Sequence, residues 1–185
     1  MKSVSSSTHS IVLIGLMGVG KTTVGRRLAT ALNRPFKDAD EEIESAAGRT
    51  VSEIFDDFGE QAFRDGERKV IARLLEEPPM ILALGGGAFI DPETRANIKG
   101  KAISVWLKAD IETLMARVSK RNTRPLLKTE DPEKVMRNLM ETRSIVYGEA
   151  DIHVNADQRT HQLTVDAIID ALRDQETRDG GTKDE

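Results

Sequence analysis

Short apolar runs alternate with longer amphipathic patterns along this chain. Apolar runs at 11–14, 36–39, 80–84, 102–107 and 151–154 have the length and residue types of buried strands. Patterns with helical spacing lie at 21–33, 60–77, 91–99, 110–120, 133–148 and 161–173. This alternation predicts an α/β domain whose parallel sheet carries helices on both faces. Polar sequence at 1–9 and 174–185 predicts flexible ends around a single domain at 10–173.

A phosphate-binding sequence directly follows the first expected strand. Residues 15–22 read Gly-Leu-Met-Gly-Val-Gly-Lys-Thr, the pattern G-x-x-x-x-G-K-[ST] between a strand and a helix. Its glycines let the backbone come close to a ligand, and its N–H groups and the helix N-terminus favour phosphate. Lys21 adds a full positive charge, and the Thr22 hydroxyl can hold magnesium. The pattern predicts a protein that handles a nucleoside triphosphate.

Two segments interrupt the simple alternation of strands and helices. The segment 40–79 is longer than one crossover helix needs, and Gly48 and Gly59 divide it into several helices. The segment 117–131 is basic at first, contains Pro125 and is flanked by helical patterns. In an ATP-binding fold such an insertion favours a mobile lid over an ordinary polar loop.

Composition narrows the class of protein. With 185 residues, 38% hydrophobic and 31% charged, the chain fits one globular domain. Its net charge of −4 lacks the basic excess of most nucleic-acid-binding proteins. It has no cysteine, and the scattered His9, His153 and His161 indicate surface or core roles rather than a metal cluster. No apolar run approaches the ~20 residues of a membrane span, so we expect a cytoplasmic protein.

Candidate site residues follow the second expected strand and lie in the insertion after it. Asp38 and Asp40 stand where ligands bind in parallel sheets, and as i and i+2 they point the same way if strand geometry continues. One carboxylate can serve a magnesium shell and the other an acceptor hydroxyl, or Asp40 merely caps a helix starting at Glu41. Arg64 and Glu67 share a helix face, either as a surface ion pair or because Glu67 orients Arg64 to grip a carboxylate.

Glycines and arginines mark two further parts of the predicted site. Gly85, Gly86 and Gly87 follow the third strand, and three glycines in a row indicate backbone pressed against a ligand rather than a flexible loop. Arginines near a lid can neutralise charge that develops on a transferring phosphate. The candidates are Arg117, Arg121, Arg124 and, in the following helix, Arg143.

Together these motifs resemble shikimate kinase over about residues 11–172. The resemblance rests on six features, which are the phosphate loop at 15–22, Asp38-Ala39-Asp40, Phe63-Arg64 with Glu67, Gly85-Gly86-Gly87, Arg124-Pro125-Leu126-Leu127, and Arg143 with Tyr147 and Glu149-Ala150-Asp151. Each feature alone is weak, but their common order and spacing make chance agreement improbable.

The resemblance implies a fold and an activity. The implied fold is a three-layer P-loop kinase fold of the nucleoside-monophosphate-kinase type, with a five-stranded parallel sheet. It includes a helical substrate-binding insertion at about 40–70 and a lid at about 117–131. The implied activity is ATP-dependent phosphorylation of the 3-hydroxyl of shikimate, with Mg²⁺, on the route to chorismate and aromatic amino acids. The family also implies a monomer.

The resemblance assigns roles to matching positions. The implied catalytic residues are Lys21, Asp40 and Arg124. The implied ATP-binding residues are Gly18, Val19, Gly20, Lys21, Thr22, Thr23, Arg117, Arg124 and Arg159, of which Arg159 is displaced by about one position from the family spacing. The implied acceptor-binding residues are Asp40, Arg64, Glu67, Gly85, Gly86, Gly87 and Arg143. Asp40 would meet the hydroxyls, Arg64 and Arg143 the carboxylate, and Thr22 and Asp38 the metal.

Two other kinds of function stay open from the sequence. A kinase of another small acceptor, such as gluconate or a nucleoside monophosphate, would share the phosphate loop, and gluconate also carries a carboxylate. A non-catalytic nucleotide-binding regulator would be expected to lack Lys21, the magnesium ligands or the lid arginine, all of which are present. Arginines for an acid together with an aspartate for hydroxyls favour shikimate.

Overall fold

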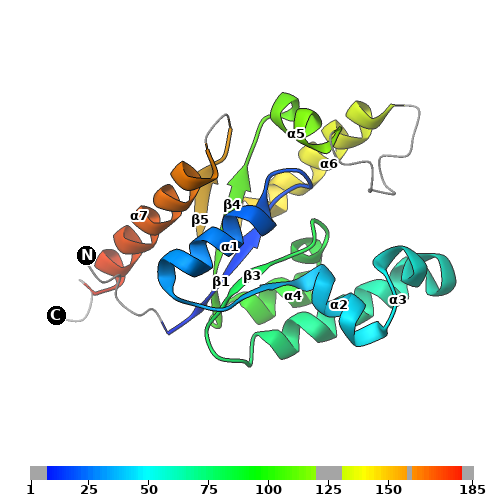
Figure 1. Ribbon diagram of the computed structural model, residues 1–185, viewed down its shortest axis with the longest axis horizontal. Helices are drawn as coiled ribbons and strands as arrows, with labels where there is room; N and C mark the ends of the chain where they lie inside the picture. Colours follow the sequence, from blue (N-terminus) through cyan, green and yellow to red (C-terminus); the bar gives the residue numbers. More distant parts are fainter. Residues whose placement is uncertain (1–7, 120–130, 158–159, 181–185) are drawn as a thin grey trace.

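The computed structural model describes residues 8–119, 131–157 and 160–180 of the chain. Its centre is a parallel sheet with strand order β2-β3-β1-β4-β5 (Figure 1). The strands are β1 (Ser10–Ile14), β2 (Phe36–Asp38), β3 (Ile81–Ala83), β4 (Ala102–Lys108) and β5 (Ile152–Asn155). Each overlaps one predicted apolar run, so the predicted five-stranded α/β sheet is confirmed.

Strand β1 occupies the middle of the sheet, and all of its residues are buried. It pairs in parallel with β3 on one side and with β4 on the other. Its run Ile11-Val12-Leu13-Ile14 is at most 1% exposed, as expected for a strand covered on both faces. The phosphate loop that follows β1 therefore starts at the middle of the sheet's carboxyl edge.

Helices cover both faces of the sheet. On one face α1 (Lys21–Leu32) and α7 (His161–Gly180) lie side by side (Figure 1). The remaining helices are α2 (Ala39–Ala47), α3 (Val51–Leu74), α4 (Pro92–Ile98), α5 (Ile111–Val118), α6 (Pro132–Tyr147) and the short 3-10 helix η1 (Ala88–Ile90). Among them α4 contacts β4, and η1 contacts α3, α4 and α6. No helix within the described ranges is long and apolar enough to cross a membrane.

The insertion between β2 and β3 consists of α2 and α3. Gly48 ends α2 with a φ of 63°, and Gly59 (φ 81°, ψ 172°) bends α3, so both glycines break helices as predicted. However, α3 starts at Val51, earlier than the helix expected from residue 60. Its start is fixed by a capping box, in which Thr50 Oγ1 accepts the Glu53 N–H and the Glu53 carboxylate accepts the Thr50 N–H.

The last helix is longer than the sequence predicted. Helix α7 continues to Gly180, so residues 174–180, which we expected in a flexible tail, are helical. Burial lowers the pKa of Arg34. The carboxylate of Glu176, in this extension, opposes that shift. Arg34 also donates a 2.8 Å hydrogen bond to the carbonyl oxygen of His9. The extension therefore lies close to the segment that leads into β1.

Gly25→Ala should destabilise the protein, because α1 packs too closely on β2 for a side chain at this position. An added Cβ would lie 2.4 Å from Phe36 Cε2 and 3.2 Å from Leu13 Cδ1. Overpacking typically costs ~1–3 kcal/mol, which exceeds the ~1 kcal/mol that alanine gains over glycine in a helix. Urea unfolding measures the difference. Gly66→Ala, whose Cβ would meet nothing within 4 Å, is the control, and equal stability of Gly25→Ala and wild type would contradict the prediction.

Candidate active site

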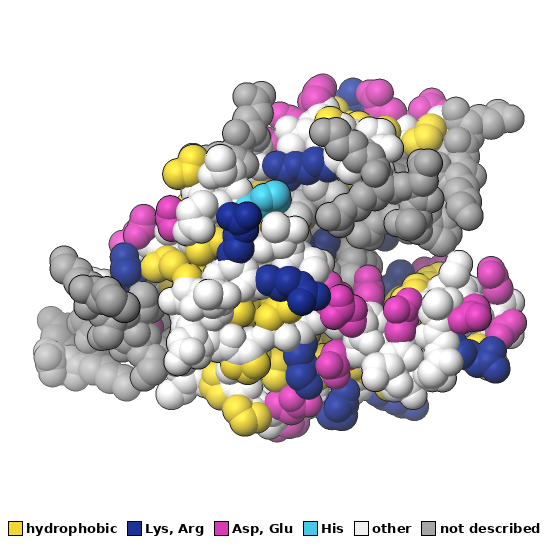
Figure 2. Space-filling view, in the orientation of Figure 1, with side chains coloured by type: hydrophobic (Ala, Val, Ile, Leu, Met, Phe, Trp, Pro, Cys, Tyr) yellow, Lys and Arg dark blue, Asp and Glu magenta, His cyan; other side chains and the backbone are white. Residues whose placement is uncertain are grey.

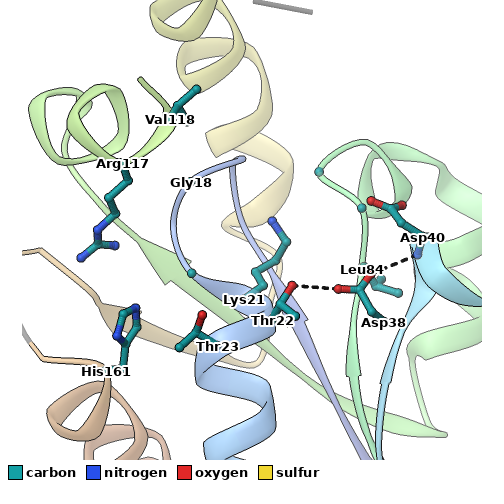
Figure 3. Close-up of a pocket in the computed structure, with 13 residues that line it drawn as sticks. Gly18, Lys21, Thr22, Thr23, Asp38, Asp40, Leu84, Arg117, Val118 and His161 are labelled. Atoms are coloured by element: carbon teal, nitrogen blue, oxygen red, sulfur yellow. Dashed lines mark hydrogen bonds between the residues drawn. The ribbon is translucent and has the colours of Figure 1, made fainter. Parts of the chain in front are cut away.

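One pocket joins the phosphate loop to the glycine run after β3. It lies at the carboxyl edge of the sheet (Figure 3). One side is formed by the loop and the start of α1, with Gly18, Gly20, Lys21, Thr22 and Thr23, and the other by Asp38, Asp40, Gly85 and Gly86. Beside it, acidic side chains gather over the α2–α3 insertion (Figure 2). Within the pocket, Lys21 and Arg117 are positive groups available to an anionic ligand.

The loop between β1 and α1 has the backbone shape of a phosphate nest. Gly15, Gly18 and Gly20 have φ angles of 144°, 82° and 100°, which residues with a side chain rarely adopt. A Cβ on Gly15 would lie 2.6 Å from the carbonyl oxygen of Leu107, so the loop is pressed against β4. Helix α1 begins at Lys21, directly after the loop, and places its positive dipole end at the pocket.

Lys21 is held over its own loop. Its Nζ donates to the carbonyl oxygens of Gly15 at 2.7 Å and Leu16 at 3.2 Å. The ammonium group thus stands at the mouth of the nest, next to where the outer phosphates of a nucleotide bind in loops of this type.

Thr22 and Asp38 bring two oxygen ligands together. Thr22 Oγ1 donates a 2.8 Å hydrogen bond to Asp38 Oδ2 across the pocket (Figure 3). Hydroxyl and carboxylate oxygens suit Mg²⁺, which commonly takes one or two protein ligands together with phosphates and water. Within the described residues, no group of three His, Cys, Asp or Glu side chains could form a larger metal centre. The pair therefore fits a magnesium ion that arrives with a nucleotide.

Asp40 does not cap a helix that starts at Glu41. Helix α2 begins at Ala39, and its N-cap is Asp38, whose Oδ1 accepts the Asp40 N–H at 3.1 Å. Strand geometry ends at Asp38, so the two aspartates do not share a strand face. The capping interpretation was therefore wrong. Asp40 lies in the first turn of α2 and lines the pocket beside Gly85.

Arg64 and Glu67 form a part-buried pair on α3, with the glutamate on the inner side. Arg64 Nη1 donates to Glu67 Oε2 at 2.6 Å, and Glu67 is only 2% exposed. The interpretation as a surface ion pair is therefore wrong, and the arrangement fits a glutamate that orients Arg64. Glu67 Oε1 is buried without a hydrogen-bond partner. Burial raises the pKa of Glu67, Arg64 opposes the shift, and the negative charges of Asp40 and Asp91 add to it.

Arg143 approaches the glycine run from α6. Its guanidinium lies beside Gly86, and Tyr147, one turn further along α6, donates its hydroxyl to the Gly86 carbonyl oxygen. Tyr147 is 1% exposed. Burial raises its pKa, and the positive charge of Arg143 opposes that shift. Since Arg64 lies beside Gly87, two guanidinium groups from different helices meet at one loop.

Arg117 and His161 flank the other end of the pocket (Figure 3). Arg117 donates to the carbonyl oxygens of Val19 at 3.0 Å and Ala156 at 3.2 Å, which ties α5 to the phosphate loop. A Cβ on Gly20 would lie 3.3 Å from His161 Nε2. The sequence analysis missed His161 as a pocket residue. Its position just after the last strand, at the carboxyl edge, is the signal that could have found it.

Some predicted site residues lie outside the described residues. They are Arg121, Arg124 and Arg159. Of the predicted lid at 117–131, the structure describes only 117–119 and 131. The roles of these three arginines and the motion of the lid therefore stay predictions from the sequence.

Comparison with known proteins gives the family. A family model described as shikimate kinase matches residues 17–173. A shikimate kinase of Caulobacter vibrioides is 60% identical over 164 residues, which cover 89% of this chain and 82% of that protein. The chain belongs to the shikimate kinase family. A shikimate kinase of Bradyrhizobium diazoefficiens is 54% identical over 165 residues, covering 89% of this chain and 80% of that protein.

Solved structures agree with membership of the shikimate kinase family. A shikimate kinase from Acinetobacter baumannii in complex with shikimate matches with a TM-score of 0.87 and 36% identity, covering 91% of this chain and 95% of that chain. A gluconokinase from Sinorhizobium meliloti has a TM-score of 0.64 at 18% identity, covering 95% and 98% of the two chains. That likeness shows a common fold alone. The predicted P-loop kinase fold is confirmed, and the gluconate alternative is not favoured.

Glu67→Gln should change how the stability of the protein depends on pH. With a raised pKa, folded Glu67 keeps its proton above its usual value of 4.5, where the unfolded chain has lost it. The contribution of Glu67 to stability therefore falls as the pH rises from 4.5 through the folded-state pKa. Urea unfolding at several pH values should show wild-type stability minus variant stability decreasing over that range, and an increasing difference would refute the raised pKa.

Asp110→Asn is the matched control for this measurement. Asp110 accepts hydrogen bonds from Thr113, and these lower the Asp110 pKa below its usual 3.8. Its contribution is therefore fully present above pH 3.8 and is lost only as the pH falls through the folded-state pKa. The stability difference between wild type and Asp110→Asn should stay constant over the range in which the Glu67 difference changes.

Proposed function

We propose that this chain transfers the γ-phosphoryl group of ATP to the 3-hydroxyl of shikimate, yielding ADP and shikimate 3-phosphate on the route to chorismate and aromatic amino acids. The observation that carries the proposal is one pocket in which a phosphate loop faces Asp40, with two guanidinium groups at the adjoining glycine run. Shikimate is a small polyol with one carboxylate, and this set of side chains complements it.

The nucleotide side of the proposal uses the phosphate loop. Residues 18–23 would bind the phosphates of ATP, and Thr22 and Asp38 would hold Mg²⁺. The ion would neutralise charge on the β- and γ-phosphate oxygens. Arg117, fixed by two backbone carbonyls, would lie against the adenine base. Arg124 would reach the phosphates from the lid, and Arg159 would be a second base contact.

The acceptor side uses groups with separate tasks. Arg64 and Arg143 would hold the carboxylate of shikimate, and Glu67 keeps Arg64 in place through their 2.6 Å hydrogen bond. Asp40 would face the 3-hydroxyl, orient it toward the γ-phosphorus and accept its proton. Phosphoryl transfer depends mainly on positioning and charge neutralisation, which such an arrangement provides. One chain supplies all of these residues, which fits a monomer.

Release of ADP from ATP, measured with different acceptors, tests the proposal. Shikimate should give sustained turnover, while gluconate and nucleoside monophosphates should give background rates. Mass spectrometry should identify a singly phosphorylated shikimate. Faster turnover with gluconate would overturn the acceptor assignment, and no turnover with any acceptor would favour a nucleotide-binding regulator.

Lys21→Ala should lower kcat by about a hundredfold or more, since loss of a preorganised positive donor costs roughly 3 kcal/mol of transition-state stabilisation. The fold should survive, because the first turn of α1 is closed by the backbone bond from Val24 N–H to the Gly20 carbonyl oxygen and has no side-chain cap. Steady-state kinetics and thermal unfolding measure both effects. Lys69→Ala, an exposed lysine on α3, serves as the control. Near-wild-type turnover in Lys21→Ala would show that the loop lysine is not catalytic.

Arg64→Lys, Arg143→Lys and Asp40→Asn should affect different kinetic constants. The acceptor carboxylate does not react, so each Arg→Lys change should mainly raise the KM for shikimate, by about tenfold or more, through loss of the two-point grip. Asp40→Asn removes the proton acceptor at the reacting hydroxyl, so kcat itself should fall.

Controls for these three variants come from α3, the helix that carries Arg64. Arg68→Lys and Asp65→Asn alter an ion pair on α3 that bonds at 3.1 Å and belongs to no part of the proposed site. Both should leave kcat and KM close to wild type. If Asp40→Asn changes only the KM for shikimate, Asp40 positions the substrate and the proton-acceptor role is wrong.

A further inference from the structure

The glycine run Gly85–Gly87 does not depend on the backbone freedom of glycine. None of its three residues is among the described glycines with a positive φ. Gly87 has a φ of −95° and a ψ of −17°, which residues with side chains adopt without strain. Backbone conformation therefore does not explain why three glycines stand in a row at the edge of the pocket.

The space around Gly87 and Gly86 is filled by two different guanidinium groups. A Cβ on Gly87 would lie 2.6 Å from Arg64 Nη2 and 2.8 Å from both Arg64 Cζ and Nη1. A Cβ on Gly86 would lie 3.0 Å from Arg143 Nη1. Contacts below 3.0 Å are essentially never made by real Cβ atoms, so any side chain at 87 must displace Arg64. At 86 the overlap is smaller but concerns the other arginine.

The space around Gly85 is filled by the two carboxylates. A Cβ there would lie 2.8 Å from Asp40 Oδ1 and 3.2 Å from Glu67 Oε1. The three glycines thus face three different parts of the acceptor site in chain order, first the carboxylates, then Arg143, then Arg64. At each of the three positions, the atom nearest to the added Cβ belongs to a different residue.

We propose that each glycine of the run is a positioning residue for a different acceptor-binding group. Gly85 makes room for Asp40, Gly86 for Arg143 and Gly87 for Arg64. The inference rests on the proposed function, which gives these groups a carboxylated polyol to bind. Because none of the three glycines has a side chain, a charged group can occupy the space beside each of them. The run thereby sets where the acceptor-binding groups lie.

Alanine at these positions should disturb function more than folding. The atoms that a Cβ would meet are the far ends of flexible side chains, which can move away. Gly15 is different, because a Cβ there would meet the backbone oxygen of Leu107 at 2.6 Å. The three alanine variants should therefore fold and carry a displaced arginine or aspartate. Gly87→Ala should be the least stable of them, because moving Arg64 weakens its bond to the buried Glu67.

Steady-state kinetics on single variants give the first test. Gly87→Ala and Gly86→Ala should raise the KM for shikimate about tenfold and about threefold or more, with the KM for ATP within about twofold. Gly85→Ala should instead lower kcat. Gly66→Ala, on α3 between Arg64 and Glu67 with nothing within 4 Å of its Cβ, is the control and should leave these constants unchanged. Unchanged kinetics in folded Gly87→Ala, or equal losses in every constant for all three variants, would overturn the proposal.

Double-mutant cycles identify the side chain through which a glycine acts. If Gly87 acts through Arg64, Gly87→Ala should add little to the KM for shikimate when Arg64→Lys is already present. Combined with Asp40→Asn, the fold-changes should multiply, because the two changes disturb separate groups. If the fold-changes multiply when Gly87→Ala is combined with Arg64→Lys as well as with Asp40→Asn, Gly87 does not act through Arg64.

Crystal structures distinguish failure of this inference from failure of the proposed function. In Gly87→Ala, the Arg64 guanidinium should leave its bond to Glu67 Oε2 while the backbone of 85–87 stays in place. A shifted backbone with Arg64 unmoved overturns the positioning role, whatever the activity. Wild-type protein that does not phosphorylate shikimate overturns the proposed function, and the displacement of Arg64 in the variant still decides whether Gly87 positions it.

Discussion

The hydrogen bond from Thr22 Oγ1 to Asp38 Oδ2, 2.8 Å long, joins the phosphate loop to the insertion that carries the acceptor residues. Thr22 lies in the first turn of α1, whereas Asp38 ends β2 and caps α2 with its other oxygen. One carboxylate therefore fixes the start of α2, the place of Asp40 in its first turn and one candidate magnesium ligand. Substitution of Asp38 would disturb all three at once, so lost activity there cannot be assigned to the metal alone.

Charges of both signs balance around the glycine run. Arg64 and Arg143 bring two positive charges, and Asp40 and Glu67 bring two carboxylates within the same small volume. A buried charge without a partner typically costs several kcal/mol, so the pair of Arg64 and Glu67 has to be kept or lost as a unit. A guanidinium carries five N–H donors, and the bond to Glu67 leaves others for a second carboxylate. Pairing within the protein and binding of an acid are therefore compatible.

The sequence predicts the parts of this structure that depend on neighbouring residues. The strand before the phosphate loop and the glycines within it form one local pattern, and both appear in the structure where predicted. Asp40 was harder to place, because the start of α2 depends on a cap by Asp38 two residues earlier. The burial of Glu67 was not predictable from its helical spacing. It depends on how α3 packs against the glycine run.

Two further differences between the expected and the observed structure also arise from packing between residues distant in the sequence. His161 lines the pocket beside Gly20, which is far away in the sequence. The end of α7 looks like a solvated tail by composition, yet Glu176 acts on Arg34 at the other end of the chain. In both cases the local sequence is polar and lacks a motif. Gly20 lies beside His161, and Arg34 near Glu176, only once the chain has folded around the sheet.

The unpartnered oxygen of Glu67 has a consequence for inhibitor design. Oε1 is buried and accepts no hydrogen bond within the described part of the chain, while Oε2 accepts one from Arg64. A ligand whose amide or hydroxyl donor reached this oxygen past Gly85 would gain a hydrogen bond there. Such a donor would act beside the carboxylate grip of the arginines. It would be an anchor on the acceptor side of the pocket, on the opposite side from the phosphate loop.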